Sequence, residues 1–250
     1  MSILRNRNLQ IVIAAVVLAV TGGSLVGPIL PAMLGPLDVA EEEVGLVLSV
    51  YTLLALIGTP FLGLLSDRIG RKAVLVPCLI LFGLAGASIA LVRTFWAVLI
   101  LRAVQGVAVG GLMNTGVTLI GDMFHGADRA RAMGYRITFQ TVTNSFLPFL
   151  SGGLATLAWF YPFLLYGLAL PLGLLAALQL RVEDSHDGTD HGKSGSVPGL
   201  MAYILRARSL WVFFSNLTAF VLLFAMVVYL PLVVVQKMGL GTLHSGLALS

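Results

Sequence analysis

Long apolar runs that follow one another along the chain limit its possible folds more than any other feature. Each run has about the 20 residues that a helix needs to cross the hydrocarbon core of a bilayer. The runs are Leu9–Leu34, Val44–Leu65, Ala73–Val92, Phe95–Ile120, Ile137–Leu157, Tyr161–Leu180 and Leu210–Val235, and another starts near Thr242. Only 10% of the residues are charged, whereas soluble domains carry about 25%. The sequence therefore predicts an all-α polytopic membrane protein with the lipid bilayer as a partner.

The basic residues predict which side of the membrane each connection occupies. They gather before the first run and after the second, fourth and sixth runs: Arg5, Arg7, Arg68, Arg71, Lys72, Arg129, Arg131, Arg136, Arg181, Lys193, Arg206 and Arg208. The alternate connections hold only Arg93 and Lys237. Because short cytoplasmic loops carry an excess of Lys and Arg, we expect a multi-pass protein of the cell membrane with a cytoplasmic amino terminus. The net charge of +4 then reflects topology and indicates no nucleic-acid partner.

A change in composition after the sixth run predicts two transmembrane units. Residues 183–197 are polar and glycine-rich, which is typical of a solvated linker. We expect a six-helix bundle at 1–182, a cytoplasmic linker at 183–207, and helix 7 with the start of helix 8 at 208–250. The alternative is a metal site formed by the aspartates and histidines of the linker, which a segment without fixed second-shell partners disfavours.

A charged turn separates the second and third runs: Gly63-Leu64-Leu65-Ser66-Asp67-Arg68-Ile69-Gly70-Arg71-Lys72. Its charges cannot lie in hydrocarbon, so it marks a membrane surface, and its basic excess favours the cytoplasmic one. The pattern G-x-L-S-D-R-x-G-R-K at this place in the helix order resembles the signature loop of the major facilitator superfamily of secondary transporters. The resemblance implies a twelve-helix protein whose six-helix bundles are each built from two inverted three-helix repeats. A generic positive-inside turn is the alternative.

An arginine, Arg102, lies inside the fourth run, where a charge costs at least about 2.5 kcal/mol on insertion scales. Because Gln105 shares its helix face, the sequence predicts an arginine directed into a polar cavity. An arginine that snorkels to the surface near Phe95 is the alternative. The segment Arg102-Ala103-Val104-Gln105-Gly106 resembles the second signature of the family, R-x-x-Q-G, whose arginine is associated with proton coupling or with organising the cavity. Gly106 and Gly110 have the spacing of a close helix–helix contact.

Uncharged polar side chains add a candidate substrate pathway. Gln140, Thr143 and Asn144 share one face of the fifth run, and the fourth and seventh runs contain Asn114 and Asn216. Such residues suit a neutral or amphipathic solute, although hydrogen bonds between helices would explain each of them equally well. Interrupted helices also point to a transport pathway in this family. The first run is interrupted by Gly22, Gly23, Gly27, Pro28 and Pro31.

The resemblance further implies a cytoplasmic gate formed by Gly63, Asp67, Arg68, Gly70, Arg71, Lys72 and Asp122. In the family, an acid at the end of helix four pairs with a base of the signature loop, which here corresponds to Asp122 and Arg71. An exposed pair contributes only about 0–1 kcal/mol, so its role would be that of a latch that breaks when the bundles rock. Two separately solvated charges are the alternative. Asp67 would face a helix of the second bundle.

No cofactor is expected. The lone cysteine, Cys78, excludes an intrachain disulfide and a multi-cysteine metal site. No aspartate or glutamate lies in the middle of an apolar run, which is the usual position of a carboxylate that couples transport to protons. Proton coupling would therefore involve a group outside this sequence or would act indirectly through Arg102, unless the protein is a uniporter.

These features together predict a secondary active transporter of the major facilitator type that exports small amphipathic or drug-like solutes by alternating access. The segment Leu147-Pro148-Phe149-Leu150-Ser151-Gly152-Gly153 resembles the G-P-x-x-G-G kink of the drug:proton antiporter branch, with leucine in place of the first glycine. The first alternative is a truncated relic, or a partial chain that needs a separate second half. The alternative of another class is a membrane-embedded enzyme, which the absence of H-E-x-x-H and G-x-S-x-G patterns argues against.

Overall fold

A computed structural model of the chain describes residues 3–180 and, after them, residues 214–215, 218–219, 221–222, 225–230 and 233–237. The predicted linker and Asn216 lie outside these residues. All regular elements within them are helical, which confirms the all-α fold class.

The first two apolar runs each form a helix in two parts. In the first, α1 (Arg7–Ser24) is followed by the 3-10 turn η2 (Gly27–Ile29) and by α2 (Leu30–Leu37). In the second, α3 (Glu41–Val44) leads through Gly45 into α4 (Leu46–Ile69). The remaining elements are η1 (Ile3–Arg5), α5 (Arg71–Ser88), η3 (Ile89–Leu91), α6 (Phe95–Met123), α7 (Gly126–Ala155), α8 (Tyr161–Leu164), η4 (Leu165–Leu168), α9 (Ala169–Gln179) and the π-helical turn η5 (Val233–Lys237).

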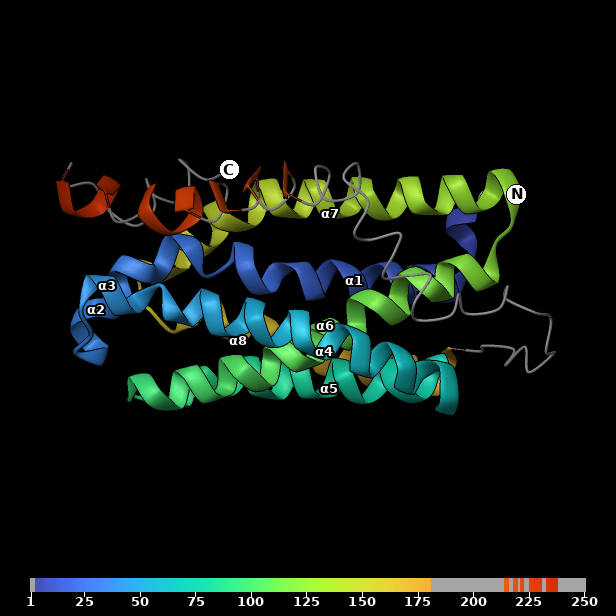
Figure 1. Ribbon diagram of the computed structural model, residues 1–250, viewed down its shortest axis with the longest axis horizontal. Helices are drawn as coiled ribbons and strands as arrows, with labels where there is room; N and C mark the ends of the chain where they lie inside the picture. The colour runs from blue at the N-terminus through green and yellow to red at the C-terminus, as the bar shows by residue number, and fades with distance from the viewer. Residues whose placement is uncertain are drawn as a thin grey trace.

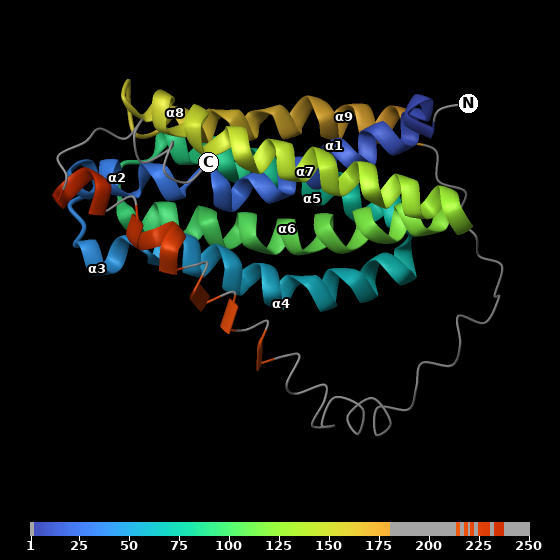
Figure 2. The same ribbon diagram turned by 90° about the horizontal axis from the view of Figure 1, so that it is seen from above.

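The long helices lie side by side along the longest axis of the molecule (Figure 1). Helix α6 packs against α4, α5 and α1, and α1 packs in turn against α7 and α9 (Figure 2). The buried apolar side chains form one continuous cluster to which all of these helices contribute. The bundle therefore has α1 and α6 at its centre, where residues distant in sequence meet.

Glycines bring α4 and α6 into backbone contact. A Cβ atom added at Gly110 would lie 2.7 Å from the carbonyl oxygen of Ala55 and from the amide nitrogen of Thr59. A Cβ atom at Gly58 would lie 3.0 Å from the carbonyl oxygen of Val107. Backbone atoms cannot move aside as a flexible side chain can, so only glycine fits at Gly110. The close contact expected from the spacing of Gly106 and Gly110 is present.

Two charged connections are shorter than the sequence predicted. The signature turn is the single residue Gly70, between α4 and α5, and its φ of 98° is a conformation that favours glycine. Helix α7 begins at Gly126 rather than near Ile137. The physical reason is that charged residues continue a helix readily beyond hydrocarbon, as the i,i+3 pair of Asp128 and Arg131 does at 3.4 Å.

Within the described residues, five helical segments are long and apolar enough to cross a membrane: Arg7–Leu37, Glu41–Ile69, Arg71–Leu91, Phe95–Met123 and Tyr161–Gln179. Helix α7 is not among them, although its 30 residues extend for about 45 Å at 1.5 Å per residue. Its polar side chains lower its apolar content, and it lies beside α1 in the bundle. The predicted run Ile137–Leu157 is therefore helical, but its composition alone does not identify it as a membrane span.

Candidate functional site

The guanidinium of Arg102 is fully buried. Its Nη1 donates to Gln105 Oε1 at 2.9 Å and to the carbonyl oxygen of Gly22 at 3.2 Å. Its Nη2 donates to the hydroxyl oxygen of Tyr166 at 3.4 Å. The side chain thus points into the bundle and does not snorkel to the surface.

Aromatic rings enclose the same guanidinium. Its central carbon lies 4.9 Å from the ring centroid of Phe163, 5.3 Å from that of Tyr166 and 5.7 Å from that of Tyr51. The negative faces of such rings attract a cation, and no carboxylate of the described residues forms an ion pair with Arg102. In this conformation, rings and backbone therefore surround the arginine, where the sequence predicted a polar cavity.

The break after α1 supplies a carbonyl acceptor to Arg102. The N–H of Val26 donates to the carbonyl of Gly23 at 3.1 Å rather than to that of Gly22, four residues back. The Gly22 oxygen instead accepts from Arg102 and lies 3.2 Å from the hydroxyl of Tyr166. A charged donor at a helix break offsets the loss of the helical bond and part of the cost of burying the charge.

Side chains of α7 also form hydrogen bonds with residues at the end of α1. The hydroxyl of Ser24 donates to Asn144 Oδ1 at 2.8 Å, and the hydroxyl of Ser151 donates to the carbonyl of Leu25. Residues from α6, η4 and α7 therefore all bond to α1 within a few residues of its end. This arrangement ties the interrupted helix to three neighbours through side chains.

Several residues of this cluster escape prediction from the sequence. Tyr51, Phe163 and Tyr166 look like ordinary core aromatics in their apolar runs, and nothing local indicates that they meet Arg102. The one available signal was chemical, because a buried tyrosine hydroxyl needs an acceptor. The hydroxyl of Tyr51 finds it in the carbonyl of Ala19, at 3.0 Å.

The predicted pathway residues do not form one site. Asn114 is half-buried, donates to the carbonyl of Thr59 at 3.5 Å, and lies on α6 about 18 Å beyond Arg102 at 1.5 Å per residue. Asn144 bonds to α1, and Gln140 is half-buried one turn before it on α7. The cluster around the α1 break thus includes Arg102, Gln105 and Asn144, whereas Asn114 lies apart.

A second charged cluster joins the ends of α4, α5 and α6. Arg71 forms ion pairs with Asp67 and, at 3.4 Å from Nε to Oδ2, with Asp122. Its Nη1 also donates to the hydroxyl of Ser66 at 2.9 Å. The side chain of Arg71 is 20% exposed, and those of Asp67 and Asp122 are 57% and 35% exposed. The charges of Arg71 and Asp122 are therefore paired rather than separately solvated.

The remaining signature residues surround this cluster without joining its ion pairs. Arg68 lies exposed on the last turn of α4, and Lys72 lies on the first turn of α5. Gly63 packs closely against the amide of Asn114, so a larger residue there would displace the Asn114 side chain. The signature therefore contributes a packing contact and an ion-pair cluster at one end of the bundle.

The sequence model of the Major Facilitator Superfamily matches residues 12–250. The chain belongs to this family. This is a family of multi-pass membrane transporters. The signature turn and the R-x-x-Q-G segment thus indicated the correct family.

Two curated relatives are exporters or resistance proteins by name. The chain is 37% identical over 161 residues to the bacillibactin exporter of Bacillus subtilis, a match that covers 61% of this chain and 40% of that protein. It is 27% identical over 203 residues to the quinolone resistance protein NorA of Staphylococcus aureus, with coverage of 80% and 51%. The chain thus spans about half or less of the length of these relatives.

A solved transporter shares the fold. The crystal structure of a bacterial homologue of the human lysosomal transporter Spinster, inward-facing and unoccupied, matches with a TM-score of 0.78 at 16% identity. The match covers 97% of this chain and 59% of that one. It confirms the all-α polytopic fold of the superfamily.

Proposed function

We propose that this protein is a secondary active transporter that moves small amphipathic, drug-like solutes out of the cell by alternating access. Its relatives support the direction, because one is named as an exporter and another as a drug resistance protein. The distribution of Lys and Arg supports a cytoplasmic amino terminus in the cell membrane. The observation that carries the proposal is the cluster in which Arg102 bonds to the interrupted helix α1.

The break in α1 suits a part that changes conformation. Backbone carbonyl groups at the break accept hydrogen bonds from the side chains of Arg102, Tyr166 and Ser151. Hydrogen bonds between helices in a membrane are worth only about 0.6 kcal/mol on average, so they can exchange partners at low cost. An amphipathic solute that reaches α1 would compete for the same groups, and its binding would thereby be coupled to the geometry of the break.

The ion pairs of Arg71 form the latch in this mechanism. They join the ends of three helices but contribute little stability in water, about 0–1 kcal/mol. Such a latch holds one conformation of the bundle and opens without a large barrier. The single residue Gly70 connects α4 to α5, so we expect the latch to open by movement of these helices as a pair against a second bundle.

Coupling to protons is part of the proposal only indirectly. The carboxylates of the described residues lie at helix ends or in connections, at Asp38, Glu41, Glu42, Glu43, Asp67, Asp122 and Asp128. The coupling group then belongs to the rest of the carrier or acts through Arg102. We further propose that the full transport cycle needs a second six-helix bundle, because the matches cover only 40% and 51% of the length of the two curated relatives.

Dye efflux tests the proposal. Cells would express the chain alone, or together with the carboxyl-terminal bundle of the bacillibactin exporter, and efflux of a fluorescent amphipathic dye would be measured. Efflux above that of cells without the chain supports transport, and efflux only with the second bundle identifies a partial chain. Efflux by the chain alone would exclude a non-transporting relic. If neither culture exports the dye although the protein is in the membrane, the proposed activity is wrong.

A further inference from the structure

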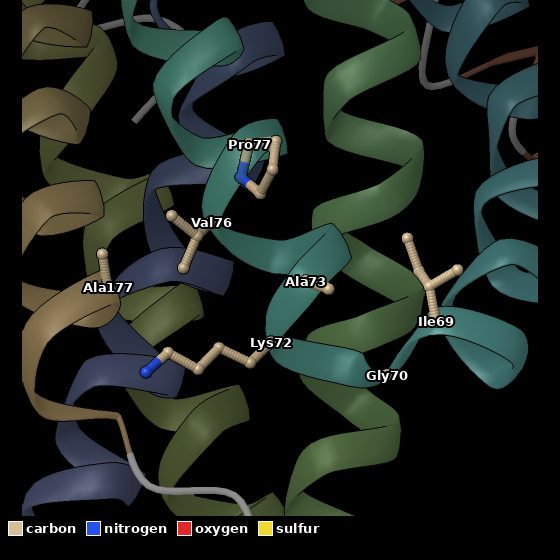
Figure 3. A pocket seen from close by; sticks show the side chains of 7 residues that line it. All are labelled: Ile69, Gly70, Lys72, Ala73, Val76, Pro77 and Ala177. Atoms are coloured by element: carbon tan, nitrogen blue, oxygen red, sulfur yellow. The ribbon is translucent and has the colours of Figure 1, made fainter.

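A hollow of about 450 Å³ lies beside the ends of α4, α5 and α9 (Figure 3). Lys72 is its charged lining residue, and the rest of the lining is apolar or glycine: Ile69, Gly70, Ala73, Val76, Pro77 and Ala177. It lies outside the cluster around Arg102, and none of the ion pairs of Arg71 involves a residue of its lining. The proposed transport cycle gives it no role.

Small side chains line part of this hollow, and the hollow ends where α5 and α9 come into close contact. Ala73 lines it on the side of Ile69, and Ala177 lines it from α9 (Figure 3). One turn before Ala177 in α9, a Cβ atom added at Gly173 would lie 3.0 Å from Cγ1 of Ile80. The two helices therefore touch toward the middle of the membrane and leave space between them at the charged end.

The surface beyond the hollow is apolar and exposed. Leu84 on α5 is 51% exposed, and Leu174 and Leu178 on α9 are 61% and 74% exposed. In a multi-pass membrane protein, such exposed leucines face acyl chains. The hollow thus opens where the lipid-facing surface of α5 and α9 meets the charged end of the bundle, which is the level of phospholipid headgroups.

Lys72 supplies a positive charge at this place. Its side chain extends from the first turn of α5 toward α9 (Figure 3). In the part of the chain that the structure describes, none of the ion pairs includes Lys72, because the neighbouring carboxylates of Asp67 and Asp122 pair with Arg71. On the same wall, Pro77 has no N–H to donate to the carbonyl of Ala73, four residues back. The hollow therefore combines a cation with a backbone acceptor at its edge and an apolar interior.

We propose that this hollow binds an anionic phospholipid. The ammonium of Lys72 binds the lipid phosphate, a headgroup hydroxyl donates to the carbonyl of Ala73, and the start of an acyl chain fills the space between α5 and α9. Phosphatidylglycerol has the required negative charge and hydroxyl donors, whereas phosphatidylcholine has neither a net charge nor a hydroxyl in its headgroup. A free phosphate ion would leave the apolar interior empty, so a lipid is the occupant that fits both parts of the hollow.

Native mass spectrometry of the full chain tests the inference. The purified protein would be titrated in detergent with phosphatidylglycerol or phosphatidylcholine, and the bound lipids counted. We expect phosphatidylglycerol to bind more tightly, and Lys72→Gln to weaken it about five-fold, since a basic residue near a membrane surface contributes about this factor. Lys72→Arg should retain the affinity. The matched control is Arg68→Gln, which removes a charge from the same turn but not from the hollow.

A second variant separates the site from a general charge effect. Ala177→Leu fills the hollow without changing any charge, and we expect it to weaken phosphatidylglycerol binding as well. Soluble sn-glycerol 3-phosphate at the same concentration should not displace the lipid, because it lacks an acyl chain. The inference is overturned if Lys72→Gln weakens binding no more than Arg68→Gln, if both lipids bind equally, or if sn-glycerol 3-phosphate competes. None of these readouts depends on transport activity.

Discussion

Replacement of Arg102 by methionine should reduce transport strongly while lowering the stability of the fold only slightly. Methionine is a flexible apolar side chain that can fill the space left by the arginine stem. The change removes the hydrogen bonds to Gly22, Gln105 and Tyr166 and takes the cation out of its aromatic enclosure. It also removes the only buried charge of the bundle among the described residues.

The stability terms of this substitution partly cancel. Three hydrogen bonds of 2.9–3.4 Å at about 0.6–1.7 kcal/mol each amount to roughly 2–5 kcal/mol. The cation–π contacts add about 1–2 kcal/mol. Against these, an arginine in the middle of a membrane helix costs about 2.5–3.5 kcal/mol, a cost that methionine does not carry. The net destabilisation is then about 2 kcal/mol, which a folded membrane protein tolerates.

The assay compares Arg102→Met with Ile100→Met, a change on the same helix at a side chain that is 65% exposed. Both proteins should purify as single species, and the melting temperature of Arg102→Met should fall by only a few degrees. Dye efflux in cells that contain the active transporter should fall more than ten-fold for Arg102→Met and stay unchanged for Ile100→Met.

Two outcomes would refute the reasoning. Normal efflux by Arg102→Met would show that the arginine has no part in transport. Failure of Arg102→Met to fold, with Ile100→Met intact, would show that its bonds to α1 are structural and much stronger than typical intramembrane hydrogen bonds.

Three further predictions concern the helix contacts and the latch. In a double-mutant cycle, Ser24→Ala and Asn144→Leu should show a coupling of about 0.6 kcal/mol in unfolding free energy; strict additivity would mean that their 2.8 Å hydrogen bond contributes nothing. Gly110→Leu should abolish folding because its side chain meets the backbone of α4, whereas Gly134→Ala, with open space around the added Cβ atom, should leave the melting temperature equal or higher. Arg71→Gln removes both ion pairs of the latch and should cost at most about 2 kcal/mol, or about 0–1 kcal/mol for each pair, while changing the rate of exchange between conformations, measured by spin-label distances; an unchanged rate would contradict the latch.

The helices of this fold could be predicted because their main signal is local. Each apolar run from Leu9 to Leu180 corresponds to helical segments in the structure. Their ends could not be predicted, because polar and charged residues are compatible with both a loop and a helix that extends beyond the bilayer. Gly70 illustrates this point, since a single residue with positive φ replaces the loop that its charged neighbours indicated.

The candidate site was predictable only in part. The pair Arg102 and Gln105 follows from an i,i+3 spacing, which is a property of one helix. Their partners Tyr51, Phe163 and Tyr166 come from other helices, more than 50 residues away in sequence, and only packing brings them together. The predicted pairing of Arg71 with Asp122 rested on the family resemblance, and the structure places these side chains 3.4 Å apart. The proposed roles of all these residues in transport remain predictions.

The polar composition of α7 bears on how the protein enters the membrane during synthesis. A helix with so many amide and hydroxyl groups would not partition into lipid by itself. It directly follows the apolar helix α6, from which only Phe124 and His125 separate it, so the two can enter as a hairpin. Helix α1, already in place, offers Ser24 and the carbonyl of Leu25 as the first partners of its polar face. We therefore expect biogenesis to depend on the order in which the helices emerge from the ribosome, with α7 admitted to the bilayer by helices made before it.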